Sequence, residues 1–431
     1  MLSVPSSVPS FRQLYQSGQL SQYLLLLACV AGATGLLASR ALVALSPVVG
    51  ILAVFANPHL RHDLPGYVRN GAAMRAAAMY GLFLFSAFFT SNWPKWQHEA
   101  FRLLPWIGVP LVFALAVPLR ARQRVAVGCF YVLGTAIVAL GTLAQYFRHA
   151  DAANYAFGTG RSLPSITRVF HIHFGVMLGL AFFFGLRLYQ RPTLRPWLRG
   201  LLLLAMATVV VTMHVLAYRT GLLVFYATLL FNAIRLVLRR RVALGAALLV
   251  LLAVSPWLAY RTLEPVRQRW KDTLYDIDLL RRGQDINQAS LARRLVAWET
   301  ASHLVRQNPL LGEGHADVHD AMMAQYSWRD YGLKPFNRAM IHNQYLHFLA
   351  SGGVLGLGLW LALLLWPLMQ PTQRRNPYIR EFVLVLSTAM LVDSLLEMQI
   401  GFNLFVFCYG FLVVAGEQYQ RQAARQSAAA E

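Results

Sequence analysis

The sequence predicts an all-α polytopic membrane protein with about 12 transmembrane helices and one large external loop that contains amphipathic helices. Of the 431 residues, 57% are hydrophobic and only 13% are charged, whereas soluble proteins carry about 25% charged residues. The mean hydropathy is +0.46. The apolar residues fall in repeated blocks, each close to the roughly 17 to 25 residues that cross a bilayer.

By that length criterion the sequence contains twelve candidate spans. They cover residues 22–39, 41–57, 72–91, 103–119, 125–147, 169–186, 200–217, 221–237, 242–259, 342–369, 380–399 and 401–416. We therefore expect transmembrane helices 1–9 within residues 1–259 and transmembrane helices 10–12 within residues 342–416. An external loop, residues 260–341, lies between them, and a tail follows at 417–431.

The basic residues predict how the chain is oriented. The chain has 39 Lys and Arg against 18 Asp and Glu, a net charge of +21. These cations form short clusters between apolar blocks, which favours membrane lipids over nucleic acid as the partner. Short loops retain Lys and Arg on the cytoplasmic side. An even number of spans then places both termini in the cytoplasm and the 260–341 loop outside.

The external loop contains one clear amphipathic helix. The segment from Ser290 to Gln307 places apolar side chains on one stripe, and Asn308 and Pro309 end it. We expect the stripe, which comprises Leu291, Leu295, Trp298, Ser302 and Val305, to lie against the membrane surface or to cap the bundle.

A candidate catalytic histidine, His342, stands where this polar loop gives way to the tenth span. Arg338 precedes it by one helical turn, so both side chains are expected on one helical face. Histidine can take a proton from a hydroxyl group at neutral pH. The alternative is a helix-capping or core histidine. Four glycines follow, at positions 352, 353, 356 and 358, and they are expected to allow close helix packing.

Four arginines on the external side are candidate ligands for a diphosphate. Arg219 lies in the turn between the seventh and eighth spans, Arg294 starts the amphipathic helix, Arg338 precedes the histidine, and Arg168 opens the sixth span. The planar guanidinium group matches phosphate oxygens two at a time. The alternative for each is an interaction with lipid headgroups or a loop carboxylate.

Other polar groups have less specific patterns. Asp393 and Glu397 are expected one turn apart in the eleventh span, where they either pair with an arginine or orient His342. Asp276 and Asp278, and the GHADVHD segment that begins at Gly314, are short acidic patterns that favour no metal site. Phosphate-binding loops and common hydrolase motifs are absent from the sequence, and we predict no metal and no cofactor.

Three motifs together resemble the O-antigen ligase and polymerase superfamily. They are RTG from Arg219 to Gly221, R-L-x-x-W from Arg294 to Trp298 followed by NPLLGEG, and H-N-x-x-L from His342 followed by GGVLGLG. The motifs cover roughly residues 200–360. The number of spans and the single large outer loop are most similar to the lipopolysaccharide O-antigen ligases.

This resemblance implies an inverting, metal-independent glycosyltransferase with its site facing the periplasm, in the bacterial inner membrane. The donor would be O-antigen on undecaprenyl diphosphate, and the acceptor a sugar hydroxyl of lipid A-core. Arg219 and Arg294 match the family's diphosphate-binding arginines and His342 its essential histidine. Arg338 and Arg168 are added from their position and charge. The alternatives are an O-antigen polymerase, an O-linked protein glycosyltransferase, or a transporter of polyprenyl-linked glycans.

Overall fold

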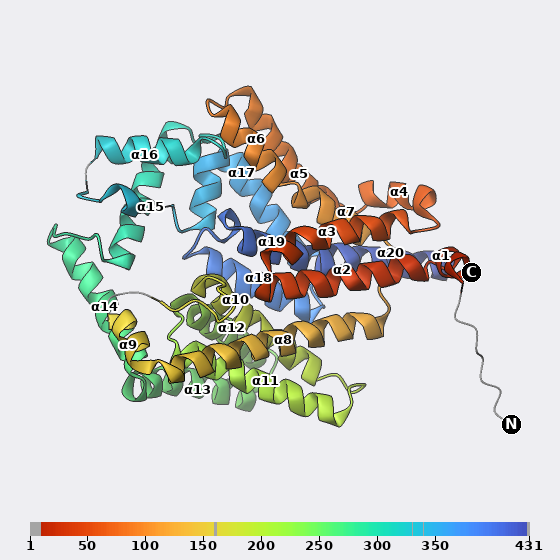
Figure 1. Cartoon of the computed structure of the whole chain (residues 1–431), viewed down its shortest axis with the longest axis horizontal. Helices are drawn as coiled ribbons and strands as arrows, with labels where there is room; N and C mark the ends of the chain where they lie inside the picture. Colours follow the sequence, from red (N-terminus) through yellow and green to blue (C-terminus); the bar gives the residue numbers. More distant parts are fainter. Residues whose placement is uncertain (1–9, 159–161, 330, 339, 429–431) are drawn as a thin grey trace.

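The computed structural model describes residues 10–158, 162–329, 331–338 and 340–428. Within these ranges all regular secondary structure is helical (Figure 1). Ten segments among them are helices long and apolar enough to cross a membrane. The predicted class, an all-α polytopic membrane protein, is confirmed.

The helices have the following bounds. Eight candidate spans are α2 (Gln19–Ala38), α5 with its 3-10 extension (Gly71–Phe88), α8 (Ala121–Arg148), α10 (His171–Tyr189), α11 (Pro196–Val215), α12 (Arg219–Leu238), α13 (Val242–Thr262) and α17 (Gln344–Met369). The span Trp93–Leu115 consists of α6 (Trp93–Arg102) and α7 (Pro105–Leu115). The span Gln399–Arg421 comprises α19 (Gln399–Tyr409) and the first part of α20 (Ala415–Ala428). The other helices are α1 (Phe11–Gln16), α3 (Arg40–Phe55), α4 (Leu60–Val68), α9 (Ala150–Gly158), α14 (Glu264–Arg281), α15 (Ser290–Gln307), α16 (Val318–Trp328) and α18 (Pro377–Met390).

Two predicted spans correspond to shorter helices. The span expected at 41–57 is α3, with 16 residues, and the span expected at 380–399 is α18, with 14. A continuous helix over 380–399 is wrong, because α18 ends at Met390 and residues 391–398 are largely irregular. Such backbone is tolerated deep in a membrane protein when other parts of the chain satisfy its polar groups.

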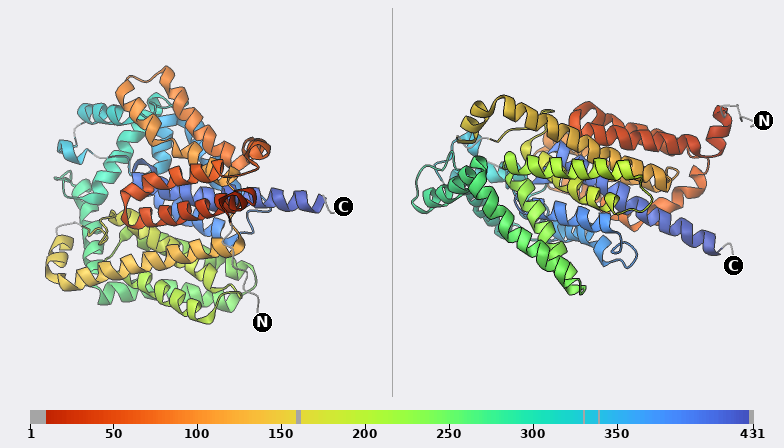
Figure 2. Two further views of the ribbon diagram at one scale, coloured as in Figure 1. Left: turned by 45° about the vertical axis from the view of Figure 1, so that its right-hand side comes forward. Right: turned by 90° about the horizontal axis from the view of Figure 1, so that it is seen from below.

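The bundle has two distinct ends. Figure 1 shows α1 and α20 at the right and α14, α15 and α16 at the left. Helix α10 is the most enclosed of the ten candidate spans, with 78% of its apolar window buried, whereas only 11% of the window of α13 is buried. Accordingly α13 lies at the edge of the bundle (Figure 2, right).

The predicted amphipathic helix is α15, with the expected bounds. Its most buried face, however, is not the predicted stripe. The fully buried side chains are small or β-branched, namely Ala292, Val296, Ala297, Thr300 and Ala301, together with Leu304. Small side chains let helices approach closely, and α15 packs against α14, α16 and α17. The helix is therefore a packed part of the protein.

Helix α17 is interrupted at Gly353, where φ is +61°. The backbone of the preceding loop fills the break: the amides of Glu313 and Gly314 donate to the carbonyls of Ala350 and Ser351. The amide of Val354 in turn donates to Pro309. The NPLLGEG and GGVLGLG motifs therefore pack directly on each other, and the glycines admit a loop where a neighbouring helix was expected.

Candidate active site

His342 lies just before α17 and not within it. Helix α17 begins at Gln344, and the side chain of Asn343 caps it by accepting a hydrogen bond from the amide of Leu346. His342 has a φ of +52°, a left-handed conformation uncommon for residues other than glycine. Such backbone outliers are concentrated at functional sites. The expected common helical face of Arg338 and His342 is therefore wrong, because neither residue is in a helix.

Asp393 is the closest polar partner of His342. Nδ1 of the imidazole is 2.9 Å from Oδ1 of the carboxylate, whose side chain is only 8% exposed. Burial by itself raises the pKa of a carboxyl group, but the hydrogen bond from His342 and the charge of Arg294 hold the pKa of Asp393 below its ordinary value. An ionised carboxylate can only accept hydrogen bonds. Nδ1 therefore donates to Asp393, and Nε2 is the ring nitrogen left to face a substrate.

Two backbone contacts hold this pair in place. The amide of Asn343 donates to Oγ of Ser394 at 3.2 Å, and the side-chain amide of Asn343 donates to the carbonyl of Leu391 at 3.0 Å. The irregular segment 391–398 thus packs against the residues that begin α17. Its departure from helical geometry is what brings Asp393 to His342.

Arg294 joins the same group from α15. Its Nη1 donates to the carbonyl of Val392 at 2.9 Å. Burial lowers the pKa of the Arg294 guanidinium, the charge of Asp393 opposes this change, and the nearby cation Arg219 adds to it. Arg294, which is within electrostatic range of both Asp393 and Arg219, therefore connects residues from distant parts of the chain.

Arg219, expected in the turn between the seventh and eighth spans, is the first residue of α12. Its Nη2 donates to the carbonyl of Arg269 at 3.2 Å and lies 3.6 Å from Oδ2 of Asp272. Arg269 is itself 6% exposed, and its guanidinium donates to the hydroxyl of Ser162 at 2.8 Å. Burial, reinforced by Arg219, lowers the pKa of Arg269 to about 10. Asp272 lies close to both arginines, and Asp276 is also within electrostatic range of Arg219.

The first turn of α10 stands beside the arginines. His171 is within electrostatic range of Arg269, Arg294 and Asp393. His173 is within range of Asp393 alone among these. Residues two apart on a helix point to nearly opposite sides. His171 and His173 therefore have different neighbours, although both are within electrostatic range of Asp393.

The other two predicted arginines occupy different places. The guanidinium Nε of Arg338 donates to the carbonyl of Leu333 at 3.4 Å, within the external segment. Arg168 is exposed and lines a cavity together with His173. No contact within the described part of the chain joins either arginine to Arg219 or His342. Arg294 is thus linked to the His342 and Asp393 pair through Val392, and Arg219 lies within electrostatic range of Arg294.

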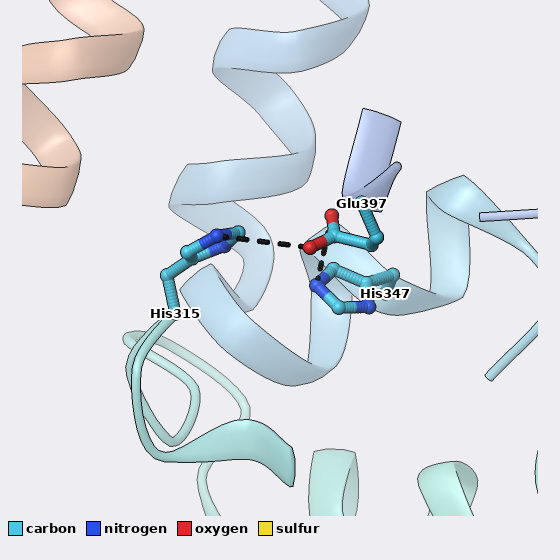
Figure 3. Close-up of side chains that lie close together, drawn as sticks. All are labelled: His315, His347 and Glu397. Atoms are coloured by element: carbon cyan, nitrogen blue, oxygen red, sulfur yellow. Dashed lines mark ion pairs between the residues drawn. The ribbon is translucent and has the colours of Figure 1, made fainter. Parts of the chain in front are cut away.

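A second buried polar cluster lies close to the first. His315, His347 and Glu397 converge from the external loop, α17 and the 391–398 segment (Figure 3). Nε2 of His347 is 3.1 Å from Oε1 of Glu397, and Nε2 of His315 is 3.7 Å from Oε2. Burial opposes ionisation, but the neighbouring histidines and Arg102 lower the pKa of Glu397 to about 2.

These three ligand types would suit a zinc ion, but a cation is already present among them. Nη2 of Arg102 lies 3.1 Å from Nε2 of His315, 3.6 Å from Oε2 of Glu397 and 2.5 Å from Oε2 of Glu99. Two further bonds, to the carbonyls of Leu396 and Glu397, fix the guanidinium there. A metal bound by these side chains would face strong repulsion from Arg102.

The acidic patterns of the external loop serve packing contacts. Asp317 accepts hydrogen bonds from the hydroxyls of Thr90 and Ser91 and from two backbone amides. Asp276 accepts from the amide of Leu291, whereas Asp278 pairs with Arg282. Asp276 and Asp278 therefore have separate partners, and Asp317 connects the loop to the start of α6.

The sequence did not single out Arg269 as a site residue. It is one of many basic residues in the 260–341 segment, and no motif distinguishes it. The sequence identifies Asp393 as a possible partner of His342, but the expectation that Asp393 lies in a helix is wrong. A signal was available there, since an Asp-Ser pair near the end of an apolar run favours a helix end over a helix interior.

Residues 204–361 match a protein-family model described as O-antigen ligase. The matched stretch contains Arg219, Arg294 and His342, and it ends before Asp393. No curated protein matched the chain in a sequence comparison. The match agrees with the order of the three motifs and with the all-helical membrane fold, and it shows that residues 204–361 are similar to O-antigen ligases.

Proposed function

We propose that this protein is an O-antigen ligase, which transfers a preassembled glycan from undecaprenyl diphosphate to a sugar hydroxyl of lipid A-core. One observation carries the proposal. The His342 and Asp393 pair, with Arg294 bonded to the adjacent carbonyl of Val392, forms a single half-buried junction where the 260–341 segment meets the start of α17. A base and a cation in one place are what a transfer between a hydroxyl and a diphosphate ester requires.

In this mechanism Nε2 of His342 accepts the proton of the acceptor hydroxyl. The hydroxyl oxygen forms a bond to the anomeric carbon of the donor while the bond from that carbon to the diphosphate oxygen breaks. Attack from the face opposite the leaving group inverts the configuration. Asp393 fixes the tautomer of the imidazole and stabilises the imidazolium that forms, which is the role a carboxylate plays beside a histidine base.

Arg219 and Arg294 bind the diphosphate and compensate the charge that grows on it, and Arg269 supports them. Preorganised charge of this kind contributes several kcal/mol to a barrier, on the order of 3 kcal/mol for a single donor group. Because the arginines supply the compensation, the reaction proceeds without a metal ion.

The orientation follows from the basic clusters of the short loops. Both termini are cytoplasmic and the His342 junction faces the periplasm, where lipid-linked glycan and lipid A-core meet. The position of α14, α15 and α16 at the end opposite α1 and α20 supports this arrangement (Figure 1).

The decisive test is transfer by the purified protein in the presence of excess chelator. The mixture contains lipid-linked O-antigen and lipopolysaccharide that lacks O-antigen. We expect polymer on lipid A-core with wild type and none with His342→Ala. Loss of the reaction on chelation overturns the metal-free mechanism. Longer lipid-linked chains as the product, or glycan on protein, would instead assign the polymerase or protein glycosyltransferase activity.

A further inference from the structure

A cavity of about 340 Å³ opens beside the candidate active site. It lies between the turn joining α2 to α3, the loop before α10 and the beginning of α19. Its polar lining includes Ser39, Arg40, Thr167, Arg168, His173 and Gln399. Neither the mechanism nor the family match uses this cavity.

The cavity carries positive charge without a compensating acid. Arg40 and Arg168 are both exposed, and the lining contains no Asp or Glu. Within the described ranges neither arginine takes part in an ion pair. Arginines at a membrane surface often contact lipid headgroups, but hydroxyl and amide groups accompany these two. An anion that also carries hydroxyl groups therefore fits the lining better than a simple headgroup phosphate.

The loop that presents Arg168 is held in one conformation. Arg168 has a φ of +62°, a left-handed conformation that costs about 1 to 2 kcal/mol for a residue with a side chain. The hydroxyl of Thr167 donates to the carbonyl of Leu37 at 2.6 Å, and the amide of Arg168 donates to the carbonyl of Ser165 at 2.8 Å. These bonds fix the loop against α2, so Arg168 is placed at the cavity rather than free to move over the surface.

His173 forms part of the cavity wall and has an unused polar atom. The residue is 1% exposed, its ring lies against the backbone of Leu395, and its Nε2 makes no contact of full hydrogen-bond geometry in the described structure. An unpaired buried group of this kind costs about 1 to 3 kcal/mol. A hydroxyl group in the cavity would provide the missing partner.

The cavity and the arginine cluster lie on different sides of Asp393. His171 faces Arg269 and Arg294, whereas His173, two residues later, lines the cavity. Asp393 is within electrostatic range of both histidines. Because the lining of the cavity includes no member of the arginine cluster, a sugar in the cavity would occupy a different site from the diphosphate.

We propose that this cavity binds a negatively charged sugar of the acceptor, one that carries a phosphate or a carboxylate, through Arg40, Arg168 and His173. The identification of the sugar as part of the acceptor rests on the proposed function. The binding of an anionic sugar does not, and it is measured separately.

Binding is tested by saturation-transfer NMR on the full chain with glucose 6-phosphate, glucuronate, glucose and inorganic phosphate as probes. We expect the two anionic sugars to bind and glucose and inorganic phosphate to bind at least about fivefold more weakly. The variant Arg40→Ala/Arg168→Ala should weaken both anionic sugars at least about fivefold. The control Arg148→Ala, which removes an exposed cation at the C-terminal end of α8 outside the cavity lining, should leave them unchanged.

Equal binding of all four probes, or equal loss in the control variant, would overturn the proposal. So would displacement of the sugars by vesicles of phosphatidylglycerol, because that result assigns the cavity to a lipid headgroup. In the transfer reaction the double variant should raise the acceptor KM at least about fivefold with kcat unchanged. If the sugars bind as expected but no variant or wild type transfers glycan, the proposed function fails and the anionic-sugar site stands.

Discussion

The pair of His342 and Asp393 makes a quantitative prediction for Asp393→Asn. The 2.9 Å contact to a buried carboxylate fixes the proton on Nδ1. An amide at position 393 has nearly the same shape but can donate its own N–H to Nδ1, which leaves the proton on Nε2 and removes the base. A positioned base is worth about 100-fold to 10,000-fold in rate, or roughly 3 to 5 kcal/mol at 1.36 kcal/mol for each factor of ten. We expect kcat to fall within that range.

The donor KM separates this explanation from general disruption of the site. The substitution removes a negative charge beside Arg294, so the donor should bind as well as before or better. Both constants are measured in the reconstituted transfer assay. Glu381→Gln is the control, since Glu381 is also a fully buried carboxylate but is bonded to Arg187. A kcat above about a third of the wild-type value would refute the assigned role, and so would losses in the double variant with His342→Ala that simply multiply.

Three further predictions concern diphosphate binding, the interrupted helix and the second cluster. Arg294→Lys keeps the charge but loses the fork that reaches Val392, so we expect at least about a tenfold loss of kcat/KM in the transfer assay, and no loss would contradict the role. Gly353→Ala places a Cβ 2.1 Å from the carbonyl oxygen of Leu310 at a φ of +61°. The expected result is a clear fall in Tm, measured in detergent, and an unchanged Tm would contradict it. The pKa of Glu397 is lowered to about 2, so its carboxylate contributes stability that is fully present above about pH 4.5. That contribution is lost as the pH falls toward 2, and the difference in stability between wild type and Glu397→Gln should shrink over this interval.

The sequence was sufficient for the parts of the fold that regular patterns encode. Apolar length located the spans, and the periodic segment ended by Asn308 and Pro309 gave the correct bounds of α15. Arg219, expected in the turn before the eighth span, is the first residue of α12, two residues before the predicted start of that span. These features depend on local sequence, which is why they could be predicted.

Features that depend on partners distant in the chain could not be predicted. The end of α18 at Met390 is stabilised by contacts from Asn343 to Leu391 and Ser394. The sequence near residue 390 does not indicate that Asn343 would make those contacts. Arg269 likewise gains its significance only from the neighbours that the fold gives it, Arg219 above all.

The two polar clusters are joined through a single amide side chain, which explains why an interrupted backbone suits this site. Oε1 of Gln344 accepts from the amide of Leu396 at 2.8 Å, and its Nε2 donates to Glu397 at 3.2 Å. Gln344 follows His342 by two residues, while Leu396 and Glu397 follow Asp393. A regular helix over 380–399 would form its own backbone hydrogen bonds and leave no amide for Gln344. The irregular segment exposes such amides to side chains from α17, and these contacts fix the distance between the histidine and its carboxylate.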